Sequence, residues 1–224
     1  HISHESAQKV QQEGAAVTWA TAWVETKLSP AALGAAGIRP GTRMVVGKHR
    51  KQPCRLGDYI ASYTLDNKAS IAILLDLATR LTQPAKTVYL VFSAKEEVGA
   101  LGALFFSHRQ RLDALIALEI CPLSEEYPIE AGDRPVLLSQ DKYGVYDEGL
   151  NHQLLQAAQA RHIPVQQAII SGFGSDASIA MTFGHIPQGA CLSFPTHNTH
   201  GYEIAHLGAI ARCIDILEQY CNDL

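Results

Sequence analysis

The segment "KTVYLVFSAKEEVGALGALFFS", residues 86–107, carries the clearest signal of the fold class. Its first part, residues 86–94, is a short β-branched and aliphatic run of the kind found in strands that are covered on both faces. Its last part opens a helix candidate over residues 99–112, and two adjacent carboxylates, Glu96 and Glu97, lie between them. A strand followed directly by a helix is the building unit of a layered α/β domain.

The alternation of strands and helices continues to the end of the chain. The sequence predicts a helix within residues 67–81, strands over 113–120, 164–170 and 189–194, and helices over 149–162, 176–183 and 203–220. We therefore expect an α/β domain over residues 59–224, with a mixed, mostly parallel sheet flanked by helices. Residues 1–58 form a separate unit in this interpretation, because short apolar stretches broken by Pro and Gly within 18–60 predict small strands around one short helix.

Composition narrows the class of protein. The 224 residues are 47% apolar and carry a net charge of −4 with no basic stripe, which argues against a nucleic-acid or anionic-membrane partner. No apolar run reaches the ~18 residues of a membrane span, and the start lacks a secretory signal pattern. The five scattered cysteines include no CxxC pair, which favours free thiols and a reducing cytoplasm. We expect a cytoplasmic protein that acts on a small molecule or peptide.

Polar side chains with metal-binding chemistry follow four of the apolar runs. Ligands in α/β sheets collect at the carboxyl ends of strands, so these positions are the natural place for a site. They are Asp66, the Glu96–Glu97 pair, Glu119 and His200. Two adjacent carboxylates at the end of a buried strand would repel each other unless a cation offset their charge. Carboxylates with imidazole suit Zn²⁺, Co²⁺ or Mn²⁺, and a bridging carboxylate can hold two ions that share a hydroxide.

Each of these residues also has a simpler interpretation when it is taken alone. Asp66 could cap the helix that follows it, Glu119 could face water at a strand end, and His200 could be an ordinary hydrogen-bonded histidine. His1 and His4 could be ligands, loop residues or a tag remnant. The combination of four such positions around a Glu–Glu pair favours a metal site, in which one glutamate of the pair binds metal and the other moves protons.

Four segments in the same order resemble the glutamyl or tetrahedral aminopeptidase family, the family forty-two metallopeptidases. They are "TLDNKAS" (64–70), "SAKEEVGALGA" (93–103), "SGFGSDASIA" (171–180) and "PTHNTHGYEI" (195–204). The resemblance implies a zinc-exopeptidase-like fold in which residues 1–58 are the remaining part of an inserted β-rich, dimerisation-type domain. It also implies two divalent transition-metal ions, zinc or cobalt, peptide substrates, and a homo-oligomer that is a dimer or larger.

The resemblance further assigns roles to individual residues. It implies Asp66 as the bridging metal ligand, Glu97 and Glu119 as terminal ligands, and His200 as the imidazole on one ion. Glu96 corresponds to the general base. It would take a proton from the water molecule that the two ions share and pass it to the departing amine. A further metal histidine of the family would lie upstream of residue 1. A place near the substrate is expected for two more residues, Asp176 and His197.

Departures from the family pattern keep alternatives open. Glu119 stands where the family has Asp, Lys68 where it has Arg, and His197–Asn198 where it has Arg-Tyr. Changes around metal ligands can alter affinity and activity. A metal-dependent carboxypeptidase or deacylase on the same fold, or a weakened structural subunit, are therefore alternatives to an aminopeptidase. The preferred N-terminal residue, native metal and assembly size do not follow from the sequence.

Overall fold

The fold is taken from a computed structural model, which describes residue 24 and residues 26–45, 47 and 52–223. The chain divides into two compact units, residues 1–45 and 46–224. The described part of the first unit contains one helix, α2 (Pro30–Ala35), which begins with Pro30 after the N-cap Ser29. Of the region 18–60 that was expected to hold small strands around a short helix, residues 18–23, 25, 46 and 48–51 lie outside the described residues, as do His1 and His4.

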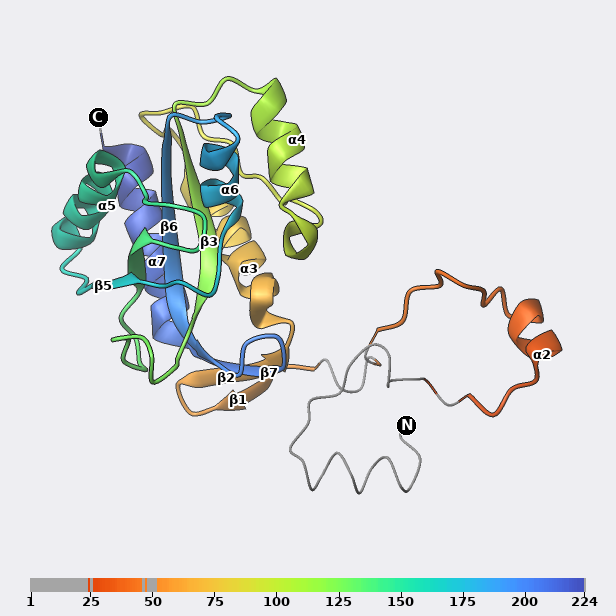
Figure 1. Ribbon diagram of the computed structural model, residues 1–224. Helices are drawn as coiled ribbons and strands as arrows, with labels where there is room; N and C mark the ends of the chain where they lie inside the picture. The colour runs from red at the N-terminus through yellow and green to blue at the C-terminus, as the bar shows by residue number, and fades with distance from the viewer. Residues whose placement is uncertain (1–23, 25, 46, 48–51, 224) are drawn as a thin grey trace. The chain divides into compact units, whose positions relative to one another are not determined.

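The second unit is built on one mixed sheet (Figure 1). The strand order is β1-β2-β7-β6-β4-β5, and β3 pairs with the other edge of β6. The strands are β1 (Cys54–Leu56), β2 (Tyr59–Tyr63), β3 (Ala114–Pro122), β4 (Val136–Gln140), β5 (Gln166–Ile169), β6 (Gln188–His197) and β7 (Tyr202–His206). The long central pairing of β3 with β6 and the pairing of β4 with β5 are parallel, and the remaining pairings are antiparallel.

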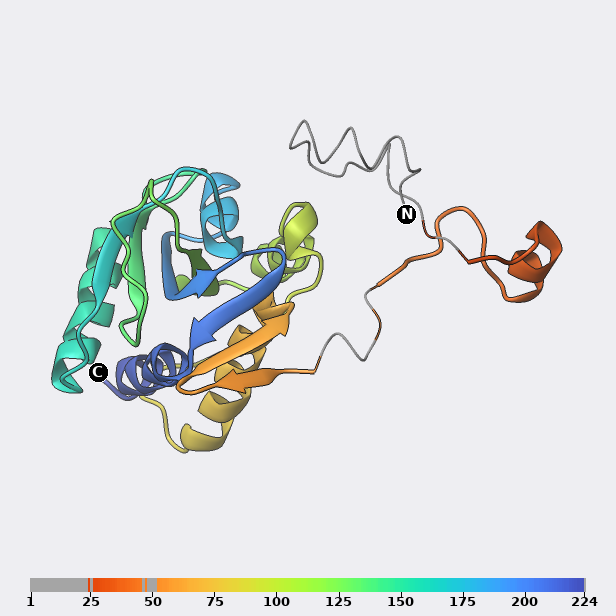
Figure 2. The same ribbon diagram turned by 90° about the horizontal axis from the view of Figure 1, so that it is seen from below.

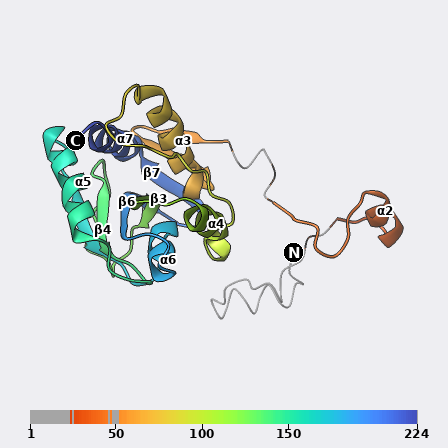
Figure 3. The same ribbon diagram turned by 90° about the horizontal axis from the view of Figure 1, so that it is seen from above.

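Helices cover both faces of the sheet, as Figures 2 and 3 show from below and above. On one face, α7 (Leu207–Asn222) lies between α3 (Leu65–Arg80) and α5 (Glu148–Ala160). Their apolar sides bury Ile73, Leu154 and Ile216 against the sheet. On the other face, α4 (Leu101–Arg109) contacts α6 (Asp176–Thr182), which packs on β3 and β6. This arrangement confirms the predicted α/β fold with a mixed sheet flanked by helices.

The predicted strand over residues 86–94 is wrong for the described structure, although residues 86–90 alternate between partly buried and exposed side chains. Val88 and Leu90 are partly buried and Tyr89 between them is exposed, but the partly buried Val91 breaks this period of two before the exposed Phe92. Leu90 packs against the core cluster beneath α3. The described strands include none that pairs with this segment, and β3 pairs with β6 alone. An apolar run becomes a strand only when a neighbour accepts its backbone hydrogen bonds.

The predicted helix over 203–220 begins later than expected. Residues 202–206 form β7 instead, which pairs along its whole length with β2 and at its middle with the end of β6. Glu203 and Ala205 are buried while their neighbours are more exposed, so this part of the sequence follows a period of two. The helix starts at Leu207, where the His206 ring accepts the Gly208 N–H at 2.9 Å. Tertiary pairing therefore overrides the helical pattern for these five residues.

Two other regions bear on the expected organisation. The strand β4 was not among the predicted elements, although three of its residues, Val136, Leu137 and Leu138, are buried. The expected domain boundary between residues 58 and 59 falls in the turn between β1 and β2, which pair with each other. The division into residues 1–58 and 59–224 stays a prediction. Among the described residues, no helix combines the length and the apolar character that a membrane crossing requires.

Candidate metal centre

Asp66 lies where the chain leaves β2 and enters α3. The preceding Thr64 has a left-handed backbone, and neither Asp66 nor Asn67 has helical torsion angles. The side chain of Asp66 is 12% exposed and does not cap the helix. The Asn67 side chain instead accepts the Ser70 N–H at 3.3 Å. The simple helix-cap interpretation of Asp66 is therefore not what the structure shows, and its carboxylate faces the other side chains of the cluster.

Glu96 and Glu97 lie on the short 3₁₀ helix η2 (Glu96–Val98) between the 86–94 segment and α4. Left-handed residues flank it on both sides, at Lys95 with φ 62° and at Gly99 with φ 109°. The start of α4 lies directly on the end of the 86–94 segment, since a Cβ on Gly102 would come within 2.4 Å of the Ala94 nitrogen. The close approach requires glycine at this position. It fixes where the chain turns and thereby where the two glutamates project.

His200 brings the third element into the cluster from the loop between β6 and β7. Its Nε2 lies 3.4 Å from Asp66 Oδ2 and 3.3 Å from Glu97 Oε2. One potential ligand atom from each of these three residues falls within 4.8 Å of the other two. The side chains of His200 and Glu97 are 59% and 56% exposed, so the cluster opens to solvent on one side. Residues from three distant parts of the chain thus meet at one point.

Glu119 and Asp176 border this group from two further elements. Glu119 is partly buried on β3, and Asn67 donates to its Oε2 at 3.0 Å and to the Leu118 carbonyl at 2.6 Å. Asp176 is the first residue of α6, where the Ser93 hydroxyl donates to its Oδ2. The other oxygen, Oδ1, is buried without a hydrogen-bond partner. An unpaired buried carboxylate oxygen is costly unless a cation or a donor completes it.

Burial and neighbouring negative charges raise the pKa values of three acids in this region. Burial, with the charges of Glu97 and Glu203, raises the pKa of Asp66 to about 6, although His200 opposes the shift. Burial and then the charge of Asp176 raise the pKa of Glu96 to about 7. For Glu119, burial is again the main cause and Asp66 adds to a pKa well above its ordinary value. Excess negative charge in a partly buried place is the condition that a bound cation relieves.

The donor set fits a divalent transition-metal ion. Asp66, Glu97 and His200 offer two carboxylates and an imidazole, a combination that suits Zn²⁺ and its neighbours. The unpaired Asp176 oxygen and the raised carboxylate pKa values are further signs that the folded chain leaves negative charge uncompensated. The residues present therefore suit the metal chemistry that the sequence predicted.

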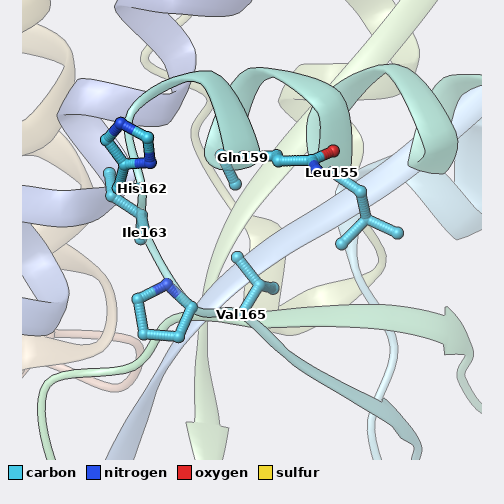
Figure 4. A pocket seen from close by; sticks show the side chains of 7 residues that line it. Leu155, Gln159, His162, Ile163 and Val165 are labelled. Atoms are coloured by element: carbon cyan, nitrogen blue, oxygen red, sulfur yellow. The ribbon is translucent and has the colours of Figure 1, made fainter.

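His197 does not join this group. It is the last residue of β6, pairs across to Ile204 of β7, and is exposed. An open pocket elsewhere lies between the end of α5 and β5 (Figure 4) and contains none of the predicted site residues. Its lining is largely apolar: Leu155, Ala158, Gln159, His162, Ile163, Pro164 and Val165. It is separate from the carboxylate cluster in its residues and its chemistry.

Sequence reasoning missed three residues that support the cluster. Glu203 contacts the main chain of both Asp66 and His200, Asn67 holds Glu119, and Ser93 holds Asp176. Glu203 lies in a stretch that was assigned to a helix, so its buried position was hidden. A period-two pattern over 202–206 is the signal that could have found it.

Solved aminopeptidases share this fold. An aminopeptidase from Desulfurococcus kamchatkensis superposes with a TM-score of 0.76 at 22% identity, over 88% of this chain and 57% of that one. The TET1 peptidase of Pyrococcus horikoshii, described as assembling into a tetrahedron or a large octahedral shell, superposes with a TM-score of 0.71 at 23% identity, over 78% and 54%.

Sequence comparison gives the family. A relative from Acetivibrio thermocellus, curated under the name "Putative aminopeptidase", is 29% identical over 168 residues, which are 72% of this chain and 51% of that protein. The chain spans about half the length of the curated relatives it matches. The family model of the M42 glutamyl aminopeptidases matches residues 1–216. The chain belongs to the M42 glutamyl aminopeptidase family.

Proposed function

We propose that the protein is a metal-dependent aminopeptidase whose metal ligands in this chain are Asp66, Glu97 and His200. The observation that carries the proposal is the meeting of these three side chains within 4.8 Å. Membership of the M42 family supports the reaction class. A divalent ion held here supplies a Lewis acid and lowers the pKa of a water molecule, which is the chemistry that peptide hydrolysis needs.

A second ion belongs to the same proposal, with Asp66 shared between the two. Glu119 is the ligand in this chain that would serve it. Burial and then the charges of Asp66 and its neighbours raise its pKa, and Asn67 donates to it directly. Zinc or cobalt is the expected metal on the chemistry of the ligands.

Glu96 is the proposed general base. It neighbours the ligand Glu97 but lies outside the three residues whose atoms converge. A pKa of about 7 means that its carboxylate can accept a proton from water and return it near neutral pH. The proton would pass through Glu96 to the nitrogen of the departing amine. A base with a much lower pKa would release the proton readily but accept it poorly.

The substrate is proposed to be a peptide with a free N-terminus. Asp176 supports this choice, because its buried Oδ1 has no hydrogen-bond partner and could accept from a substrate ammonium group. His197 is proposed to contact the substrate from the exposed end of β6. As in the TET1 peptidase, a homo-oligomer is the proposed assembly, with residues 1–58 belonging to an inserted domain that mediates contacts.

The test is metal content and hydrolysis measured together on the full-length protein loaded with Zn²⁺ or Co²⁺. We expect about two ions per chain and metal-dependent release from aminoacyl anilides, both lost in Glu97→Gln. The matched variant Glu125→Gln changes an exposed acid outside the cluster and should retain both. Hydrolysis of N-acylated substrates alone would favour a deacylase. Release of C-terminal residues alone would favour a carboxypeptidase. Absence of stoichiometric metal in the unaltered protein would contradict the proposal.

A further inference from the structure

Glu203 is a buried acid that no predicted role explains. It is the second residue of β7, and it is 1% exposed. The ion pairs of the described residues include none between Glu203 and a lysine or arginine. A buried carboxylate without a cationic partner is expensive unless hydrogen bonds satisfy it. Its hydrogen bonds therefore indicate its role.

Both oxygens of Glu203 accept backbone N–H groups from proposed metal ligands. Oε2 accepts the Asp66 N–H at 3.0 Å, and Oε1 accepts the His200 N–H at 3.0 Å. These ligands come from opposite ends of the sequence, one at the start of α3 and one after β6. A single side chain on a paired strand thus ties together the two loops that carry them.

The two loops need such a restraint because neither has regular backbone. His200 has φ 60° and Asn198 has φ 58°, both in the left-handed region that non-glycine residues seldom adopt. The Asp66 backbone has non-helical torsion angles at the start of α3. Glu203, by contrast, lies opposite Ser62 in the ladder between β7 and β2. Hydrogen bonds to an ionised acceptor are about twice as strong as neutral ones, so this carboxylate can hold both loops against a rigid sheet.

We propose that Glu203 is a positioning residue for the metal ligands, holding the main chains of Asp66 and His200 so that their side chains converge on Glu97. This inference rests on the proposed metal site. Among the described residues, Glu203 forms no hydrogen bond or ion pair with the Glu97 side chain. Its two oxygens instead accept the two N–H groups. Its effect on metal binding therefore passes through the backbone.

The test compares two nearly isosteric changes at buried carboxylates, Glu203→Gln and Asp141→Asn. Asp141 is 2% exposed and also accepts two donors, the Tyr143 N–H at 2.8 Å and the Tyr146 hydroxyl, but it contacts none of the three converging ligands. In Glu203→Gln one oxygen becomes an NH₂ group, which cannot accept an N–H. We expect the dissociation constant for Zn²⁺, measured by competition with a chelating dye, to rise about 10- to 100-fold. The visible spectrum of bound Co²⁺ should also change.

Asp141→Asn should lower thermal stability and leave both metal readouts close to those of the unaltered protein. Glu203→Asp keeps the charge but is one methylene shorter, so it should also weaken metal binding if geometry is the cause. Unchanged Zn²⁺ affinity and Co²⁺ spectrum in Glu203→Gln would overturn the inference. An equal loss of affinity in Glu203→Gln and Asp141→Asn would overturn it too, since general destabilisation would then explain both.

A metal-independent measurement separates this inference from the proposed function. Amide hydrogen exchange in the metal-free protein should be faster at Asp66 and His200 in Glu203→Gln, and unchanged there in Asp141→Asn. Exchange at the unaltered rate would show that Glu203 does not restrain the loops, whatever the protein binds. Absence of metal binding in the unaltered protein, with the exchange difference present, would instead contradict the metal site and leave the restraint as a structural one.

Discussion

Two groups of acidic residues, one partly buried and one fully buried, balance their charge in different ways. In one, burial and the charges of neighbouring carboxylates raise the pKa values of Asp66, Glu96 and Glu119. In the other, Asp141 follows β4 and receives hydrogen bonds from neutral donors, the Tyr143 N–H and the Tyr146 hydroxyl. Hydrogen-bond donors of the protein can satisfy a single buried carboxylate. Several carboxylates close together retain negative charge that a bound cation would offset. The first group is therefore where a ligand is expected.

The second group supports the first through α6. The Tyr146 hydroxyl lies 2.8 Å from Ser175 Oγ, and Ser175 caps α6 by accepting the Ser178 N–H at 3.2 Å. The Ser178 hydroxyl lies 3.0 Å from the Ser175 nitrogen and completes a capping box. Asp176 is the next residue and the first of α6, so this neutral network helps to position one acid of the charged group.

The largest effect should come from removing the proposed base. Glu96→Gln should lower kcat about 10²- to 10⁴-fold, because proton transfer through a carboxylate is lost while the proposed ligands remain. Elemental analysis should show unchanged metal content, in contrast with Glu97→Gln. Normal hydrolysis of aminoacyl anilides by Glu96→Gln would assign the base elsewhere.

The charged group should also make the metal-free protein sensitive to pH. Folding raises the pKa of Asp66 from 3.8 to about 6 and of Glu96 from 4.5 to about 7, so the folded state holds more protons than the unfolded state between these values. Stability is then greatest below about pH 4 as far as these two groups are concerned, and their contribution is lost as pH rises to about 7. Thermal unfolding of chelator-treated protein across this window measures the trend.

Added Zn²⁺ should reduce or reverse that decline, since a bound cation favours the ionised carboxylates and stabilises the folded state by mass action. Asp66→Asn should flatten the pH dependence of the metal-free protein. A metal-free protein that is equally stable at pH 4 and pH 7, with Asp66→Asn indistinguishable from it, would contradict the charge-crowding interpretation of this group.

A smaller effect is expected in the neutral group. Tyr146→Phe leaves the buried Asp141 carboxylate and the Ser175 hydroxyl each without one partner, which should cost about 1–3 kcal/mol of unfolding free energy. Denaturant unfolding measures this cost, and Zn²⁺ affinity should remain close to that of the unaltered protein. A loss of metal affinity as large as that of Glu97→Gln would show that the two groups are not separable.

The smallest change should be at the helix cap itself. Ser175→Ala removes the side-chain acceptor for the Ser178 N–H and should cost about 1 kcal/mol, whereas Ser175→Thr keeps the oxygen and should recover most of it. Equal stability of Ser175→Ala and Ser175→Thr would mean that the cap hydrogen bond contributes little.

The sequence was enough to predict the alternating α/β elements, because apolar periodicity reflects which side of each element faces the core. Helices α3, α5 and α6 and strands β3, β5 and β6 lie within two or three residues of the predicted ranges. It also placed Asp66, Glu97 and His200 after apolar runs, and these three converge in the structure. Their roles as ligands stay predictions.

The packing of the elements against one another, in contrast, determines which apolar runs become strands and which polar groups meet. Residues 86–94 are an apolar run without a paired neighbour among the described strands, and residues 202–206 become β7 because β2 lies beside them. The double hydrogen bond of Glu203 joins residues 137 and 3 positions away in sequence. Such contacts depend on how the fold brings separate elements together. A local sequence pattern does not show which distant residues will meet.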